Sequence, residues 1–194
     1  MILSDQGIKE ALKSGAIKID PPPEPDHFDP SSLDLLLGSD FQMWDRKRLT
    51  QAGADVMLNL ALQKFPETAE NYLVDAPLVD GCLIIPPYSE HPWHFLCQTR
   101  SRIQLDRQHR IAARVEGKSS LARLGLLVHL TAPTVHTTFR GRITLEVVNL
   151  GPFHIKLVPH ETRICSIIFE KVETEAAAEL ASTFQDQTRP GGTH

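Results

Sequence analysis

The sequence has few cysteines, and their spacing fits neither a metal site nor a disulfide framework. Cys82, Cys97 and Cys165 are odd in number and far apart, and no C-x-x-C pair occurs. Thiolate zinc sites and disulfide-stapled domains need close or evenly paired cysteines. Their absence excludes both classes and predicts a reducing, cytoplasmic location.

The chain also has no excess of positive charge and no long apolar run. Its 20 Lys and Arg against 24 Asp and Glu give a formal net charge of −4, whereas surfaces that bind nucleic acid are basic. No apolar stretch reaches the roughly 20 residues that span a bilayer, and the start, MILSDQGIKEAL, lacks the pattern of a signal peptide. We therefore expect no nucleic acid and no membrane as partner, although a few well-placed cations suffice for a small anion.

Several catalytic signatures are missing as well. Zinc nucleobase deaminases carry H-x-E followed by P-C-x-x-C, and the sequence contains neither half. Walker loops, G-x-G-x-x-G and G-x-S-x-G are also absent. Glu90, His91 and His94 are candidate metal ligands, but Pro92 breaks any helical register and no further ligand has matching spacing. The sequence therefore predicts no zinc site.

The chain does contain enough apolar sequence, 41% of 194 residues, for one compact domain. Near the start, Ser4 can cap a helix that Gly15 ends. Residues 21–30, PPPEPDHFDP, predict an extended connector, because proline disrupts helix interiors and central strands. Residues 31–38 predict a short strand with a turn at Gly38.

From residue 81 onward, short β-branched and aromatic runs alternate with Gly, Pro and polar turns. Such spacing is typical of a β-sandwich or barrel and not of alternating strands and helices. Residues 49–80 fit either helix or strand. Residues 173–182 are alanine-rich and favour a helix, and the end of the chain predicts a mobile tail. The β-like runs are CLIIPPYS, WHFLCQT, RIAARV, RITLEVV, HIKLVPH and RICSIIFEKV.

The stretch EGKSSLARLGLLVHLTAP, residues 116–133, places two cations and two hydroxyls beside a leucine run. Gly117 and Gly125 flank a predicted short helix at 119–124. One interpretation is an anion-binding turn, in which backbone N–H groups, hydroxyls and a lysine face the ligand. The other is a capped helix with a solvated polar side, and the pattern alone favours this second interpretation.

The stretch GRITLEVVN, residues 141–149, predicts a strand that alternates polar and apolar side chains. Arg142, Thr144 and Glu146 share one face of that strand. Burial of that face would favour a protonated carboxyl group, which suits proton transfer. The alternative is a solvated carboxylate on a half-buried strand, and periodicity alone favours this alternative.

Together, GKSSLARLGLLVHLTA and FRGRITLEVVN resemble the dCTP deaminase family, a branch of the trimeric dUTPase superfamily. The early PSSLDLLLG and the closing FQDQTRPGG are similar to further motifs of that family, and the resemblance is weakest at residues 45–80. It implies a mainly β fold, a distorted β-barrel or jelly-roll with an N-terminal helix. It also implies a β domain at 1–170, a C-terminal segment at 171–194 that closes over the active site, and a homotrimer with active sites shared between subunits.

The same resemblance implies conversion of dCTP and water to dUTP and ammonia without zinc, in pyrimidine deoxynucleotide biosynthesis. Glu146 would then be the proton shuttle that deprotonates water for attack at cytosine C4. Ser119 and Arg123 would order that water and the carboxylate. The backbone at Thr131 and Ala132 would hold the water and read the base.

For the rest of the nucleotide, the resemblance implies that Lys118, Ser119 and Ser120 meet a triphosphate that carries Mg²⁺, with Arg123 also at the substrate. Gln187 is expected beside the ligand when the tail folds over. The resemblance also raises dTTP as an inhibitor.

The chain departs from the family pattern at Pro133–Thr138. His136 stands in place of an expected Asp, and Thr137 and Thr138 stand in place of Pro and Gly. A neutral imidazole can still bond a sugar hydroxyl, which keeps His136 a candidate substrate contact, but it cannot replace a permanent carboxylate. This weighs more against dUTP hydrolysis than against deamination. The alternatives are a dUTP pyrophosphatase, a bifunctional deaminase and pyrophosphatase, and a noncatalytic nucleotide-binding regulator.

Overall fold

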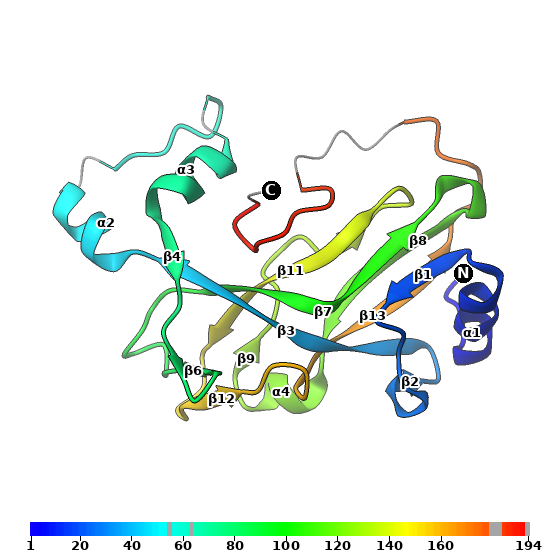
Figure 1. The fold of residues 1–194 in the computed structure, drawn as a ribbon, viewed down its shortest axis with the longest axis horizontal. Coiled ribbons are helices and arrows are strands. Elements are labelled where there is room, and N and C mark those ends of the chain that lie inside the picture. The colour runs from blue at the N-terminus through cyan, green and yellow to red at the C-terminus, as the bar shows by residue number, and fades with distance from the viewer. Residues whose placement is uncertain (54–55, 63, 179–183, 193–194) are drawn as a thin grey trace.

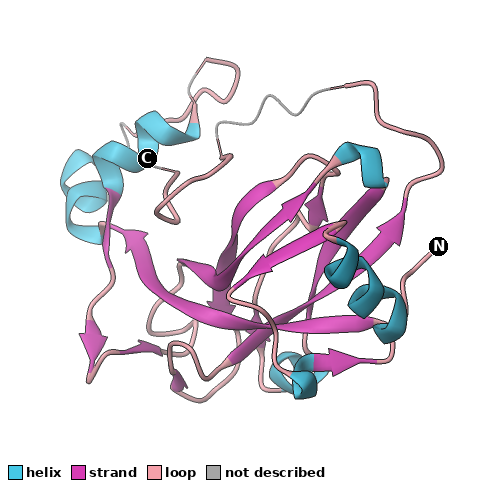
Figure 2. Ribbon diagram, turned by 45° about the vertical axis from the view of Figure 1, so that its right-hand side comes forward, coloured by secondary structure: helices cyan, strands magenta, loops and turns pink. Residues whose placement is uncertain are grey.

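The computed structural model describes residues 1–53, 56–62, 64–178 and 184–192. Strands form its centre and short helices lie around them (Figure 1, Figure 2). The helices are α1 (Asp5–Ser14), α2 (Arg46–Ala52), α3 (Phe65–Tyr72) and α4 (Ser119–Arg123). The strands are β1 (Ile17–Asp20), β2 (Phe28–Asp29), β3 (Ser32–Trp44), β4 (Leu73–Asp75), β5 (Leu78–Val79), β6 (Cys82–Ile85), β7 (Phe95–Leu105), β8 (Ile111–Gly117), β9 (Leu126–Leu127), β10 (Thr134–Val135), β11 (Arg140–Asn149), β12 (Ile155–Leu157) and β13 (Arg163–Lys171).

One large antiparallel sheet carries most of the fold, in the order β10-β8-β13-β3-β7-β11-β9, and a smaller sheet has the order β12-β6-β5. Register shifts interrupt the pairing of β3 with β7, of β11 with β7 and of β13 with β3. Such irregularities bend a strand and increase its twist. The large sheet therefore curls around the core (Figure 1), which confirms the predicted mainly β, barrel-like fold.

Strand β3 corrects the expected short strand at residues 31–38. It continues through Gly38 and pairs first with β13 and then with β7. A Cβ added at Gly38 would lie 2.9 Å from the carbonyl oxygen of Gln98. The glycine therefore allows a close approach of two backbones at the register shift, and it does not end the strand.

The N-terminal helix is confirmed, and the connector after it is corrected. Ser4 Oγ accepts a backbone N–H at the start of α1, and Gly15 ends the helix with a φ of 77°. Residues 21–30 are only partly extended, because Pro25–His27 form a 3₁₀ turn; Phe28–Asp29 are extended and pair with β3 as β2. Proline is well tolerated in the first turn of a helix, where its missing N–H has no partner to lose.

Three weaker expectations have different outcomes. The described residues 56–62 form neither helix nor strand, and Leu60 and Leu62 are exposed. The alanine-rich segment has no helix at 173–178, and its remainder lies outside the described residues. The C-terminal tail, residues 184–192, was expected to be mobile but packs against the sheet.

Across the described part of the chain, every helix falls short of the length and apolarity that a bilayer crossing demands.

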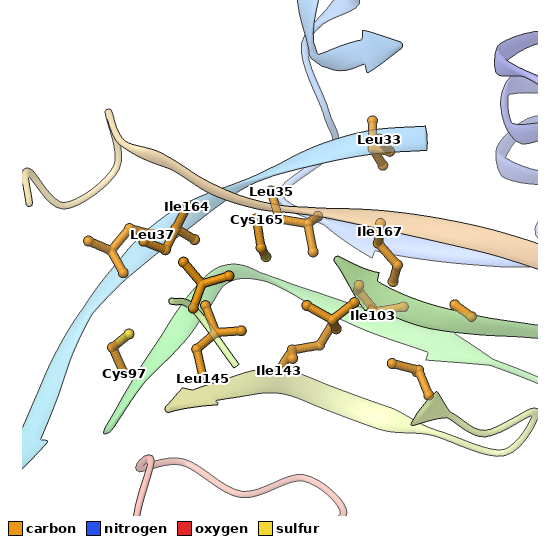
Figure 3. Close-up of a cluster of buried hydrophobic side chains, with 14 of the residues drawn as sticks. Leu33, Leu35, Leu37, Cys97, Ile103, Ile143, Leu145, Ile164, Cys165 and Ile167 are labelled. Carbon is orange, nitrogen blue, oxygen red and sulfur yellow. The ribbon is translucent and has the colours of Figure 1, made fainter. Parts of the chain in front are cut away.

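The core lies inside the curl of the large sheet (Figure 3). Leucines and isoleucines at alternate positions of β3, β7, β11 and β13 meet there, since alternate strand residues share one face. Cys97 and Cys165 are free and buried among them. Burial raises the pKa of Cys165 to about 12 and raises the pKa of Cys97 as well, so both remain protonated, unreactive thiols.

A buried charge joins the start of α4 to the core. Asp34 of β3 is only 4% exposed, and its carboxylate binds the Lys118 ammonium directly before α4. Ser166 of β13 donates to the same carboxylate at 2.8 Å, and Arg163 lies 3.7 Å from it. A carboxylate so deeply buried depends on these partners, since an isolated ion there would lose its hydration.

We expect Lys118→Met to lower the free energy of unfolding by about 3 kcal/mol, because it removes the main counter-charge of a buried carboxylate. Urea denaturation measures this change. Lys18→Met is a matched control, since Lys18 is more than half exposed and lies 3.8 Å from Asp106; its loss should be much smaller. Equal stability of the two variants would contradict the role given to Asp34.

Candidate active site

Glu146 is half-buried on β11, opposite Leu96 of β7. Its strand neighbours Leu145 and Val147 are fully buried on the core face, so alternation directs Glu146 to the other face. The backbone N–H of Leu130 donates to Glu146 Oε2 at 3.4 Å. The carboxylate therefore lies on the polar face of a half-buried strand, beside a loop at the wall of a cavity.

That cavity has a volume of about 330 Å³, which is in the range of small-molecule sites. It brings together three of the predicted site residues, Glu146, Ala132 and Gln187. Leu96, Val135, Phe139, Ile143 and Phe184 supply much of its apolar wall. A carboxylate in a recess with a largely apolar wall and a few polar side chains is an arrangement typical of binding and active sites.

The C-terminal tail closes one side of the cavity. Gln187 is 5% exposed, and its Nε2 donates to Thr144 Oγ1 of β11 at 2.5 Å. Gln185 accepts from the Arg140 N–H at 2.7 Å, and its amide donates to Thr138 O at 2.8 Å. Figure 1 shows the tail beside β11. The predicted position of Gln187 next to the proposed ligand site is thus compatible with this packing.

Sequence reasoning considered His94 only as a metal ligand, yet it lines the same cavity as Glu146. It precedes Leu96 by two residues and so shares the face that Glu146 uses across the strand pair. Trp44 Nε1–H donates to His94 Nε2 at 3.2 Å. Because indole can only donate, this nitrogen must be unprotonated, and the neutral ring carries its proton on Nδ1.

His94 also separates the Glu146 cavity from a larger apolar one of about 730 Å³, which it lines together with Trp44 and Trp93. Burial lowers the pKa of His94 below its ordinary value, and the nearby charge of Glu146 acts in the opposite direction. The ring is therefore a neutral group in the wall between the two cavities.

The other predicted site residues lie elsewhere in the single chain. Ser119, Ser120 and Arg123 are exposed on α4, and none of them lines the Glu146 cavity. Figure 1 shows α4 below the sheet and the tail above it, beside β11. Lys118 begins α4 without a side-chain cap and is bound to Asp34. The predicted helix at 119–124 is confirmed as α4, which ends at Arg123.

The end of α4 is fixed to the end of β11 by a contact between backbones. Gly125 O accepts the Leu150 N–H at 2.8 Å. Gly125 has a φ of 89°, and a Cβ there would collide with the backbone of Gly151. Glycine is therefore required for both the conformation and the contact.

The divergent segment at 133–138 forms β10 and a tight turn. The Phe139 N–H donates to His136 O at 3.0 Å, so Thr137 and Thr138 are the central residues of the turn. His136 is exposed and outside the cavity lining, and so is Thr131. Phe139, directly after the turn, does line the cavity.

Comparison with known proteins assigns the chain to a family. A sequence model of the family described as dCTP deaminase-like matches residues 2–172. The chain belongs to this family. The match covers the Glu146 strand, α4 and the loop beside the carboxylate, and it ends before the tail.

Curated relatives of the dCTP deaminase-like chain match nearly its whole length. A Methanothermobacter thermautotrophicus protein named "dCTP deaminase, dUMP-forming" is 36% identical over 97% of this chain and 91% of the relative. A Rhodospirillum rubrum protein named "dCTP deaminase" is 34% identical over 98% of this chain and 94% of the relative.

A solved structure supports the fold alone. The 2′-deoxycytidine 5′-triphosphate deaminase of Agrobacterium tumefaciens matches with a TM-score of 0.61 and 18% identity. The match covers 88% of the dCTP deaminase-like chain and 48% of the solved chain, so this chain spans about half the length of that one.

Several residues that line the Glu146 cavity could be assigned to it only weakly, or not at all, from the sequence. Arg142 and Thr144 were visible as the polar face of β11. Leu96, Phe139 and Phe184 carry no local signal, because only the pairing of β7 with β11 and the packing of the tail bring them to Glu146.

We expect His94 to titrate below its ordinary pKa of 6.5 and to be protonated on Nδ1 when neutral. In Glu146→Gln its pKa should fall further, because the charge that raises it is gone. Nitrogen-15 NMR of the imidazole measures both. An unchanged pKa in Glu146→Gln would contradict the proximity of the two groups.

Proposed function

We propose that this chain deaminates dCTP hydrolytically, with Glu146 as the group that moves protons. The observation that carries the proposal is the Glu146 carboxylate in the wall of a 330 Å³ cavity, next to the loop of Leu130 and Ala132. The printed names of full-length relatives support it. The absence of the zinc deaminase motif from the sequence supports a route without zinc.

The reaction would begin with a water molecule between Glu146 and C4 of the cytosine. Glu146 takes a proton from the water as its oxygen bonds to C4, and passes a proton to N3. Glu146 then carries the proton of the new C4 hydroxyl to the amine; the C4–N bond breaks as the C4 carbonyl forms, which gives dUTP and ammonia. The apolar wall and the packed tail keep other water away, which strengthens the electrostatic interactions of the carboxylate.

The exposed residues of α4 would complete the site of a neighbouring copy in a homotrimer. Ser119 and Arg123 would then order the water and the carboxylate of the neighbour, while Ser120 and Lys118 face its triphosphate. Their exposure and their absence from the cavity lining support this division. A role of Lys118 at phosphate would require it to share its charge with Asp34. Inhibition by dTTP and a cytoplasmic location remain parts of the same proposal.

Mg²⁺ would enter with the nucleotide. The described residues hold no group of three His, Cys, Asp or Glu that could bind a metal ion, and Glu146 is the one carboxylate in the lining of its cavity. With one carboxylate in the cavity lining, a Mg²⁺ there would keep its waters and bind chiefly to phosphate oxygens. Bound there, the ion would reduce the negative charge of the triphosphate.

A second candidate is a bifunctional enzyme that releases dUMP and pyrophosphate. The printed names of the Methanothermobacter thermautotrophicus relative and of others favour it. His136 is exposed on the divergent turn and offers no permanent carboxylate for the second hydrolysis. We therefore expect dUTP as the main product.

Glu146→Gln should lower kcat for ammonia release from dCTP with Mg²⁺ by at least about 100-fold, because the proton shuttle is lost. Glu116→Gln is the control, since Glu116 is an exposed carboxylate of β8 paired with Arg114. Chromatography of the products separates dUTP from dUMP. Equal activity of the Glu146 variant would refute the mechanism, and tight binding without turnover would indicate a noncatalytic regulator.

Mixed trimers test whether the site is shared. Glu146→Gln and Arg123→Ala should each be nearly inactive alone. When the two are co-expressed, random assembly gives about a quarter of the sites an intact Glu146 and an intact Arg123 from different chains. Activity should return to about that fraction; no recovery would place the whole site within one chain.

A further inference from the structure

Two arginines lie directly opposite each other near the proposed site. Arg102 of β7 and Arg142 of β11 are cross-strand partners, and their side chains are 43% and 41% exposed. Like charges in directly opposed positions destabilise a sheet. This pair therefore needs negative charge from elsewhere.

Part of that negative charge comes from the tail. The Asp186 carboxylate binds both Arg140 and Arg102, and the hydrogen bond from Arg140, followed by that from Arg102, holds its pKa below the usual range. The cluster thus already binds one oxyanion group, supplied by the chain itself.

Arg142 is less well neutralised than its neighbours. Its contact with Asp40 spans 4.0 Å, which is long for an ion pair. Its Nε is buried, and within the described residues it has no hydrogen-bond partner. Arg102 also has Asp20 of β1 directly opposite it, and Asp106 acts on Arg140, so Arg142 keeps the least neutralised charge of the three.

The remaining charge faces a recess that continues the Glu146 cavity. Arg102, Arg142, Gln187 and Thr188 line this recess of about 160 Å³. Arg142 and Gln187 also line the Glu146 cavity, so the two spaces adjoin. Arg142 precedes Glu146 by four residues on one strand, which spans about 13 Å, comparable with the length of an extended nucleotide.

We propose that Arg102 and Arg142 form a phosphate-binding subsite for the nucleotide whose base lies at Glu146. The planar guanidinium group matches two phosphate oxygens at once, and a polyphosphate supplies the close anionic partner that Arg142 lacks. The inference rests on the proposed function and adds that this chain itself distinguishes nucleotides from nucleosides. Arg140 and Asp186 keep the tail in place beside the bound phosphate.

Arg142→Gln tests the subsite by comparing substrates with and without phosphate. Loss of a charge-assisted contact should raise KM for dCTP roughly tenfold to a hundredfold. The kcat for dCTP should change far less than KM, and kcat/KM should fall far less for deoxycytidine than for dCTP, because the lost contact is to phosphate. Arg102→Gln should behave in the same way, and Arg142→Lys should keep part of the affinity.

Arg107→Gln is the matched control. Arg107 is 42% exposed and pairs with Glu175 at 3.5 Å, and it lies outside the lining of both spaces. Circular dichroism and size exclusion confirm that each variant is folded. If Arg142→Gln and Arg102→Gln keep the wild-type KM for dCTP, the subsite is refuted while the deaminase proposal stands.

A binding measurement tests the phosphate subsite without relying on deaminase activity. Calorimetry with inorganic tripolyphosphate needs no turnover, and we expect wild type and Arg107→Gln to bind it and the two cluster variants to lose that binding. This result in a protein that deaminates nothing would support the subsite and reject the function. Equal tripolyphosphate binding by all variants would refute the subsite.

Discussion

The antiparallel pairing of β7 with β11 is the constraint on which the rest of the site depends. It sets Glu146 opposite Leu96 and Arg142 opposite Arg102. A slip of one residue would turn every one of these side chains to the core. The fully buried Leu145 and Val147 prevent that slip, because they would then be exposed. The packing of the core therefore determines the position of the polar groups.

Much of the fold was readable from the sequence because its signals are local. The Ser4 and Gly15 caps, the runs that became β6, β7, β8, β11, β12 and β13, and the short helix α4 follow from residue types a few positions apart. The course of β3 through Gly38 was not readable, because it depends on the backbone of β7. The tail was wrongly expected to be mobile, since its contacts with Thr138, Arg140 and Thr144 join residues more than 40 positions apart.

The site was only partly predictable, because tertiary packing joins residues that are far apart in the sequence. Glu146 and Ala132 came from sequence patterns with a family resemblance, and the structure brings them to one cavity. His94 and Trp44 are 50 residues apart, and only tertiary packing turns them into a hydrogen-bonded pair. The residues of α4 stay a prediction, because a single chain contains only one side of a site proposed to be shared.

The contact between Gly125 and Gly151 has a mechanical consequence. Because it joins one backbone to another, it leaves no flexible side chain to absorb a displacement. Asp34 fixes the opposite end of α4 to the core through Lys118. An exposed helix attached at both ends in this way cannot shift independently of the sheet, and its second attachment lies just past the end of β11, whose last residue is three positions beyond Glu146.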